Sequence, residues 1–378
     1  MKRTRMLALL LALLLVAAAC AGCGSPSGAQ EDGADAAASG DASDPGDAAG
    51  SEAITLKVNN FIPENTPLAN GTLEAARKME ELSGGTMKAE VFLNGTLLGF
   101  ADTWQGTGEG AVDIGYVGPA VIDQNTVLNN IFSTPIPDLP GINLEATKAY
   151  NELIDTVPAL NEELAKSNLR WLAVEALPGA SLHTTKKLVK TPDACKGLTI
   201  EGMGAVSSNY WESLGCTTKS LDPGEYFVSL ERGVIDAYYG QWASLNNYKT
   251  VELLPYHTIF GDTSKSPAGS GLSTGVMGYV INLDTWNRLT EEQQGWLTEA
   301  FIAGGVLANT EDQAAIASGE KYAVDNGQEI FHVDTPELLK PWYDSMQAVV
   351  DTWVGACGEA GYDGKGAREA LLAILEKY

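Results

Sequence analysis

The feature that most constrains the fold of this chain is an alternation of short apolar strands with amphipathic helices, which begins at Ile54. The clearest part predicts successive strands and helices at 197–201, 205–214, 216–220, 224–232 and 234–239. Earlier strands are expected at 54–60, 87–92, 111–117 and 169–176, with helices at 67–82, 101–109 and 144–166. This order predicts an α/β fold with mixed, mostly parallel sheets and helices on both faces.

The C-terminal part is predicted to be largely helical. Thr290-Glu291-Glu292-Gln293 has the pattern of a capping box, in which Thr290 caps a helix and Gln293 reaches back to it. A long helical stretch continues from there to about Asn326, and further helices are expected at 336–357 and 366–378. A chain of 378 residues is long for one domain, so two lobes fit better.

The N-terminus has the pattern of an export signal. Basic residues come first, and the apolar run at 7–19 that comes next is shorter than the roughly 20 residues that span a membrane. Small residues precede Cys20, and this end of the run resembles a bacterial lipobox, whose cysteine receives the lipid. Residues 1–20 are therefore interpreted as a lipoprotein signal peptide with Cys20 as the lipid attachment site. Cys23, or plain secretion with cleavage nearby, is the alternative.

Residues 21–52 are expected to form a disordered acidic tether. From Gly24 onward they contain small residues and seven acids, with no basic residue and no large apolar side chain. Such a segment buries too little apolar surface to offset the entropy that ordering costs. A solvated tether would hold a folded domain clear of the membrane.

The charge of the chain excludes several classes of partner. The net charge is −25, and removing the signal peptide takes away three basic residues, which leaves 21 basic against 49 acidic residues and a net charge of −28. Nucleic acid and anionic lipid surfaces are therefore not expected as partners. Cys195, Cys216 and Cys357 show no metal-ligand spacing, and no cofactor is expected. A disulfide between Cys195 and Cys216 stays open.

Five stretches, taken in order, resemble the extracytoplasmic solute receptors of tripartite ATP-independent periplasmic (TRAP) transporters. They are Glu90–Gly99, Gly110–Gly115, Thr191–Ile200, Leu230–Ala237 and Trp286–Gln293. The resemblance implies a two-lobed periplasmic-binding-protein-like fold with a long helix bridging the lobes. It also implies capture of a small organic solute in an inter-lobe cleft and delivery to the small and large membrane subunits of a permease.

On this interpretation residues 53–175 belong mainly to one lobe and 176–275 mainly to the other. Residues 276–378 supply a crossing strand, the long bridging helix and the C-terminal helices. The protein would be exported and held on the outer face of the cytoplasmic membrane only through its lipid. The sequence leaves the solute and the oligomeric state open.

Three positions depart from the pattern of the family. Its receptors typically carry an arginine directly after the Gly-Leu-x-Ile stretch, where it clamps a substrate carboxylate with two parallel hydrogen bonds. In this chain that position is Glu201, a second arginine position is Ser181, and the supporting asparagine position is Gly240. A carboxylate beside Glu201 would meet like-charge repulsion, so weak binding of plain carboxylates is expected.

Aromatic residues gather near these positions and complete the candidate ligand site. They are Tyr116, Tyr210, Tyr238, Tyr239 and Trp242. An acid among aromatic rings suits an amine, by charge pairing and cation–π contact, or a polyol or sugar that stacks on a ring. The alternative is that about half of these aromatics are core packing. Glu201 would then be a strand-end acid, free or paired with Lys186 or Lys219.

An enzyme is not expected. His183, His257 and His332 lie on separate predicted elements without the partners of a catalytic triad. Three alternatives to a TRAP receptor remain: a receptor of the ABC-importer type, an exported hydrolase that uses paired carboxylates, and an anchored sensor or adhesin.

Overall fold

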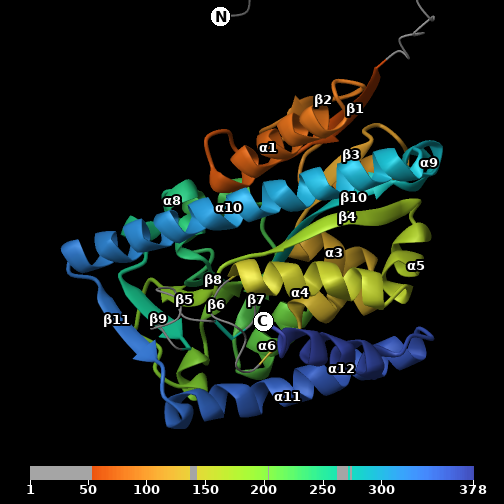
Figure 1. The fold of residues 1–378 in the computed structure, drawn as a ribbon. Coiled ribbons are helices and arrows are strands. Elements are labelled where there is room, and N and C mark those ends of the chain that lie inside the picture. The colour runs from red at the N-terminus through yellow and green to blue at the C-terminus, as the bar shows by residue number, and fades with distance from the viewer. Residues whose placement is uncertain (1–52, 137–142, 203, 262–270, 273–274) are drawn as a thin grey trace, which may run out of the picture. The chain divides into compact units, whose positions relative to one another are not determined.

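The computed structural model describes residues 53–136, 143–202, 204–261, 271–272 and 275–378 (Figure 1). The expectations for residues 1–52, namely the signal peptide, the lipidated Cys20 and the acidic tether, lie outside the described residues. Two β-sheets organise the rest of the chain. Lobe 1 is the part built on the first sheet, and lobe 2 is the part built on the second.

The sheet of lobe 1 has five strands in the order β2-β1-β3-β10-β4. These strands are β1 (Ile54–Asn59), β2 (Met87–Phe92), β3 (Ile114–Val117), β4 (Leu169–Ala176) and β10 (Val276–Asn282). Strand β1 pairs in parallel with β2 and β3, whereas β10 is antiparallel to both β3 and β4. The late strand β10 therefore completes a sheet that the first part of the chain begins.

The sheet of lobe 2 has six strands in the order β11-β9-β5-β8-β6-β7. These are β5 (Ser181–Thr184), β6 (Thr199–Glu201), β7 (Thr217–Lys219), β8 (Ala237–Gly240), β9 (Tyr256–Phe260) and β11 (Glu329–Val333). Strand β6 lies between β7 and β8 and is parallel to both, which places the ends of β6 and β8 at the same edge. The two mixed sheets confirm the predicted two-lobed α/β architecture.

A long helix joins the two lobes. Helix α10 (Glu291–Asp325) begins at the predicted capping box. The Thr290 hydroxyl accepts a hydrogen bond from the backbone N–H of Gln293, and the side-chain carbonyl of Gln293 accepts one from the backbone N–H of Thr290. It packs on α1 (Pro67–Leu82) and β4 in lobe 1, and on α8 (Trp242–Asn247) in lobe 2 (Figure 1). The predicted bridging helix is therefore confirmed.

The remaining helices cover the sheets and connect the strands. They are α2 (Thr103–Gly108), α3 (Pro119–Asn125), α4 (Asn143–Thr156), α5 (Ala159–Ala165), α6 (Ala205–Ser213), α7 (Tyr226–Glu231), α9 (Leu283–Arg288), α11 (Pro336–Glu359) and α12 (Gly364–Leu375). Short 3₁₀ turns occur at η1 (Leu128–Ser133), η2 (Pro192–Cys195), η3 (Pro223–Glu225) and η4 (Val251–Leu253). The single helix expected at 144–166 is two helices, α4 and α5, because Pro158 disfavours helical backbone at the residue before it.

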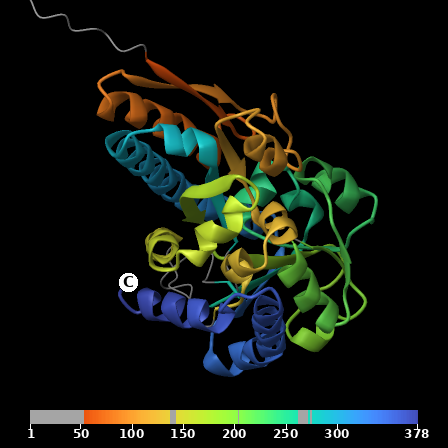
Figure 2. The same cartoon turned by 90° about the vertical axis from the view of Figure 1, so that its right-hand side faces the viewer.

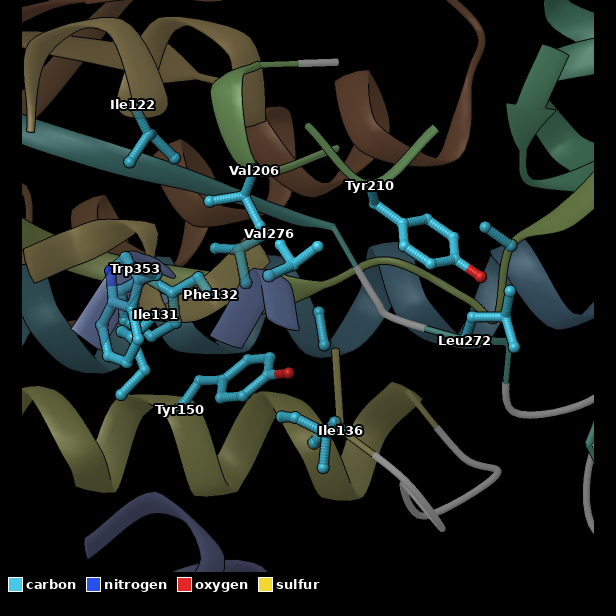
Figure 3. Packing of buried hydrophobic residues seen from close by; sticks show 14 of the residues in the cluster. Ile122, Ile131, Phe132, Ile136, Tyr150, Val206, Tyr210, Leu272, Val276 and Trp353 are labelled. Atoms are coloured by element: carbon cyan, nitrogen blue, oxygen red, sulfur yellow. The ribbon is translucent and has the colours of Figure 1, made fainter. Parts of the chain in front are cut away.

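The largest cluster of buried apolar side chains includes residues from both lobes. Trp171 of β4, Trp211 of α6 and Trp342 of α11 are among its fully buried members. Figure 3 shows part of this cluster, including Tyr150 of α4 and Tyr210 of α6. Such a shared core joins the lobes through side-chain packing in addition to the chain crossings.

Helices α1 and α10 lie side by side in both views and approach closely at two glycines (Figure 1, Figure 2). A Cβ atom added at Gly71 would lie 2.6 Å from the carbonyl oxygen of Gly304 and 3.1 Å from the Cβ of Ala308. The obstacle is mainly backbone, so the helices must move apart to make room.

We therefore expect Gly71→Ala to lower the free energy of unfolding by about 1–3 kcal/mol, the usual cost of overpacking. The matched control is Gly295→Ala on the exposed face of α10, where no atom lies within 4 Å of an added Cβ. That change should be neutral or stabilise by up to about 1 kcal/mol. Chemical denaturation of both variants measures the difference, and equal effects would contradict the close helix contact.

Candidate functional site

A cavity lies between the two lobes, and we call it the inter-lobe cavity. Its empty volume is about 600 Å³, which includes the open solvent at its mouth. Lobe 1 contributes Phe61, Ile62, Leu68, Phe100, Pro119, Ala120, Leu177 and Met277. Lobe 2 contributes Glu201, Leu221, Pro223, Tyr226, Tyr238, Gln241, Ser244 and Tyr248. All eight residues from lobe 1 have apolar side chains, so the polar side chains of this cavity lie on lobe 2.

Glu201 is the only Asp, Glu, Lys, Arg or His side chain among the described residues that line the inter-lobe cavity. It is the last residue of β6, and only 3% of it is exposed. Its Oε1 accepts a long hydrogen bond of 3.4 Å from the Tyr226 hydroxyl, whereas its Oε2 has no partner. Burial raises the pKa of Glu201 to about 8, and the hydrogen bond from Tyr226 opposes that rise.

The structure gives Glu201 no basic partner among the described residues. Its register neighbour on β7, Lys219, is exposed, and Lys186 forms an ion pair of 2.5 Å with Asp236. The alternative in which Glu201 pairs with one of these lysines is therefore wrong for this structure. An unpaired buried carboxyl facing a cavity is costly unless a proton or a ligand neutralises it.

Aromatic rings from both lobes form much of the cavity wall. In lobe 2 the ring of Tyr226 lies 5.2 Å from that of Tyr238 and 5.3 Å from that of Tyr248, measured between centroids. In lobe 1 the rings of Phe61 and Phe100 lie 4.8 Å apart, edge to face. The buried acid therefore opens onto a space with ring surfaces on two sides.

A second group of polar atoms comes from the start of α8. The Ser244 hydroxyl donates to Oε1 of Gln241 at 3.3 Å, and the Nε2 of Gln241 is buried without a partner. Gln241 directly follows β8, whose end lies at the same edge as that of β6. The cavity therefore holds one unpartnered acceptor, on Glu201, and one unpartnered donor, on Gln241.

Of the predicted site residues, Glu201 and Tyr238 line the inter-lobe cavity together. Ser181 and Gly240 are register partners on β5 and β8 and are buried outside its lining, and Trp242 packs against His183 and His257. Tyr116 lies in lobe 1, where its hydroxyl donates to Glu175.

Tyr210 and Tyr239 line a different, smaller cavity with an empty volume of about 260 Å³. Leu272 also lines it, and its backbone N–H donates to the Tyr239 hydroxyl at 2.9 Å. Figure 3 shows Tyr210 and Leu272 at this place in the core. The two tyrosines therefore do not lie beside Glu201 in the lining of the inter-lobe cavity.

Sequence reasoning missed several lining residues. Gln241 was the easiest to find, because it lies two residues after the predicted strand 234–239, which corresponds to β8 and ends beside β6. Tyr226, Tyr248, Phe61 and Phe100 lie on a short helix or in loops. No periodic pattern marks such positions as facing a cavity.

The two lobes also meet at Asp123 of α3 and Gly204, the residue before α6. Gly204 has a φ of +91°, and a Cβ added there would overlap the carboxyl group of Asp123. Asp123 is buried and accepts from the Ser133 hydroxyl at 3.0 Å. Burial raises its pKa to about 7, against the effect of hydrogen bonds from Ser133 and from the backbone of Val206. This contact lies close to the segment that carries Glu201.

Two histidines and the three cysteines of the described residues are buried in the protein interior. The Nδ1 atoms of His183 and His257 lie 2.7 Å apart in the interior of lobe 2. Cys195, Cys216 and Cys357 are free, and the thiol of Cys216 donates to the carbonyl oxygen of Cys195 at 3.4 Å.

Among the described residues, no group of three or more His, Cys, Asp or Glu side chains is placed to hold a metal ion. No helix in that part of the chain is long and apolar enough to cross a membrane.

Comparison with known proteins gives a consistent result. Residues 58–355 match the family model described as bacterial extracellular solute-binding protein, family 7. The C4-dicarboxylate-binding protein DctB of Bacillus subtilis is 26% identical over 251 residues, which is 66% of this chain and 67% of that protein.

Solved structures share the fold. One is a TRAP solute-binding protein from Rhodoferax ferrireducens in complex with copurified benzoate, with a TM-score of 0.74 at 22% identity. The matched region covers 86% of this chain and 98% of the Rhodoferax chain. A TRAP periplasmic solute-binding protein from Chromohalobacter salexigens with bound D-glucuronate has a TM-score of 0.70 at 20% identity, covering 83% and 99%.

Proposed function

The chain belongs to the bacterial extracellular solute-binding proteins of family 7, and we propose that its inter-lobe cavity is where the solute binds. The observation that carries this proposal is the cavity itself, in which two unpartnered polar atoms, one on the buried acid Glu201 and one on Gln241, meet aromatic rings from both lobes. Binding sites of this kind are mostly apolar and carry a few well-placed polar groups. From the predicted set we keep Glu201 and Tyr238 as solute contacts, and we add Gln241 and Tyr226.

The protein is a solute-binding receptor of the TRAP type, and its relatives are solute-binding proteins rather than enzymes. The family match therefore favours a transport receptor over the ABC-importer receptor, the exported hydrolase and the anchored sensor. We propose the small and large membrane subunits of a TRAP permease as its partners. We also propose attachment to the outer face of the membrane through a lipid on Cys20.

The chemistry of the cavity supports a solute that is not held through an arginine–carboxylate clamp. The names of similar proteins include ligands with a carboxylate, such as benzoate, glucuronate and C4-dicarboxylates. In this chain the described lining residues include no basic side chain, and the buried acid Glu201 stands at the usual arginine position. We therefore propose an amine, or a polyol or sugar, as the solute.

The experiment that tests the receptor function starts from protein purified from its native membrane. Mass spectrometry should find a copurified small organic solute and an N-terminus that begins at a lipid-modified Cys20. After removal of the solute, small-angle scattering should show compaction when it is added back, because a ligand that contacts both lobes favours the closed state. An unchanged radius on saturation with every copurified compound would contradict the receptor function. A mature chain that begins at Cys23 would contradict only the lipidation site.

A further inference from the structure

We infer that the solute carries an ammonium group that pairs with Glu201 inside a cage of aromatic rings. This inference rests on the proposed function and adds the chemical class of the solute. Three features of the inter-lobe cavity carry it: the unpartnered acid, the ring surfaces beside it and the division between a polar and an apolar wall.

The first feature is a buried acceptor without a counter-charge. Oε2 of Glu201 is buried and has no hydrogen-bond partner, and the only bond to Oε1 is the 3.4 Å contact from Tyr226. A ligand ammonium supplies both the missing positive charge and several N–H donors, or a diffuse positive charge if it is quaternary. A carboxylate supplies neither.

None of the described residues around Glu201 supplies this positive charge. The hydroxyls of Tyr226 on α7 and Tyr238 on β8 are neutral, and burial raises the pKa of both. Lys219 on β7 is exposed and forms no ion pair with Glu201. Asp123 of α3 and Asp222 before η3 are outside the lining of this cavity, and as acids they supply no positive charge.

The second feature is the set of rings. Tyr226, Tyr238 and Tyr248 cluster in lobe 2 and Phe61 with Phe100 in lobe 1, and all five line the same cavity. The face of an aromatic ring attracts a cation through its quadrupole, and the attraction strengthens where water is excluded. Rings around a buried carboxylate therefore favour an ammonium over an uncharged head group.

The third feature decides between an amine and a polyol. Every lining residue from lobe 1 is apolar, whereas Glu201, Gln241, Ser244 and the tyrosine hydroxyls lie on lobe 2. A polyol carries hydroxyls on all sides and would leave those that face lobe 1 without partners, which is costly. An amine with a polar end and an apolar body matches the two walls. The unpartnered Nε2 of Gln241 can donate a hydrogen bond to one acceptor of the solute near the ammonium.

The net charge of −25 acts in the same direction at longer range. A strongly acidic protein raises the local concentration of cations and speeds their association, and it repels anions. The effect falls as ionic strength rises, which separates it from the contact with Glu201.

The test uses four probes that share a phenyl ring and differ in the polar group attached to it: benzylamine, benzyltrimethylammonium, benzyl alcohol and benzoate. Calorimetry on the solute-free wild type should show both cations binding at least about tenfold tighter than benzyl alcohol, with benzoate weakest. Burial keeps Glu201 largely protonated at pH 7 because its pKa is about 8. A cation needs the ionised form, so the affinity for benzyltrimethylammonium should rise between pH 6 and 8, by up to about tenfold per pH unit.

The same linkage predicts that cation binding releases a proton, nearly one per cation at pH 7. Binding heats in buffers with different ionisation enthalpies measure that number. Glu201→Gln should abolish both the proton release and the pH dependence, and it should lower cation affinity at least tenfold at pH 8. Glu231→Gln is the matched control, since it removes the same charge from an exposed position at the end of α7.

Affinity for benzyl alcohol, which needs no charge, checks that Glu201→Gln still folds. If that variant fails to fold, the pH dependence and proton release of the wild type decide. Tightest binding by benzoate or by benzyl alcohol, or no binding by either cation, would overturn the ammonium inference. Those outcomes leave the receptor function intact if the copurified solute still compacts the protein, so the two failures are distinguishable.

Discussion

The free energy of unfolding is expected to fall by several kcal/mol as the pH rises from about 5 to about 9. Burial raises the pKa of Asp123 and of Asp312 to about 7 and that of Glu201 to about 8. It also raises the pKa of Glu175, which the nearby Asp312 raises further. Each of these carboxyl groups binds a proton more tightly in the folded chain than in the unfolded one.

The direction in which stability changes with pH follows from this tighter proton binding in the folded chain. A group whose pKa is raised by folding contributes stability that is fully present below its unfolded pKa, near 4, and is lost as the pH rises through the folded value. For Asp123, a change from 3.8 to about 7 corresponds to about 4 kcal/mol. For Asp123, Asp312 and Glu201 the loss therefore lies between about pH 4 and 8.

The buried histidine pair acts in the opposite direction at lower pH. Burial and the neighbouring His257 lower the pKa of His183, and burial lowers that of His257 to about 4. The stability that this pair contributes is present above about pH 6.5 and is lost as the pH falls toward the folded values. Four buried acids outnumber the two histidines, so the histidine pair reduces the decline in stability below about pH 6.5 and does not reverse it.

Denaturant unfolding of the solute-free protein between pH 4 and 9, at constant ionic strength, measures this profile. Asp312→Asn should flatten the decline below about pH 7, because it removes a buried acid whose pKa is about 7. Glu231→Gln, which changes an exposed acid, should leave the slope unchanged. A stability that stays constant or rises from pH 5 to 9 would contradict ionisation of these buried groups in the folded state.

The second large effect is expected for Gly204→Ala, which should weaken solute binding at least about tenfold. Gly204 has a φ of +91°, and an added Cβ would overlap the carboxyl group of Asp123 on the other lobe. Moving the lobes apart relieves that overlap, so the change disfavours the closed form in which both lobes contact the solute. An overlap that costs about 1.4 kcal/mol is enough for a tenfold change in affinity.

Gly197→Ala is the matched control. Gly197 precedes β6 in the same lobe with a φ of +82°, but no atom lies within 4 Å of an added Cβ. Both substitutions place alanine in the left-handed region at similar strain, about 1–3 kcal/mol, and only Gly204→Ala adds the contact between lobes. Affinity for the copurified solute should therefore fall only in Gly204→Ala.

Adding Asp123→Ala to Gly204→Ala should recover part of the lost affinity, because it removes the overlapping carboxyl group and leaves only the Cβ of residue 123, 2.7 Å from the added Cβ. The single Asp123→Ala variant completes the double-mutant cycle and isolates the pairwise interaction. Equal losses of affinity in Gly197→Ala and Gly204→Ala, or no recovery in the double variant, would show that backbone strain alone caused the effect.

Local sequence signals predicted the elements that depend on neighbouring residues. The capping box at Thr290 marked the start of α10, and the strand that ends at Glu201 was predicted at its true end. Apolar spacing alone joined α4 to α5 across Pro158, because that spacing continues through the proline. The same signals missed β5 and β9, which are antiparallel neighbours in lobe 2 and not part of the βαβ order.

The sequence by itself thus determined the family, the α/β character and the presence of an acid in place of a basic clamp, since these depend on residue type, order and spacing. Only the tertiary structure decided which side chains surround Glu201. Phe61 and Tyr248 line one cavity although 187 positions separate them, whereas Tyr239, next to Tyr238, lines another. Successive side chains of a strand point to opposite faces, and the surroundings of each face depend on how distant elements pack.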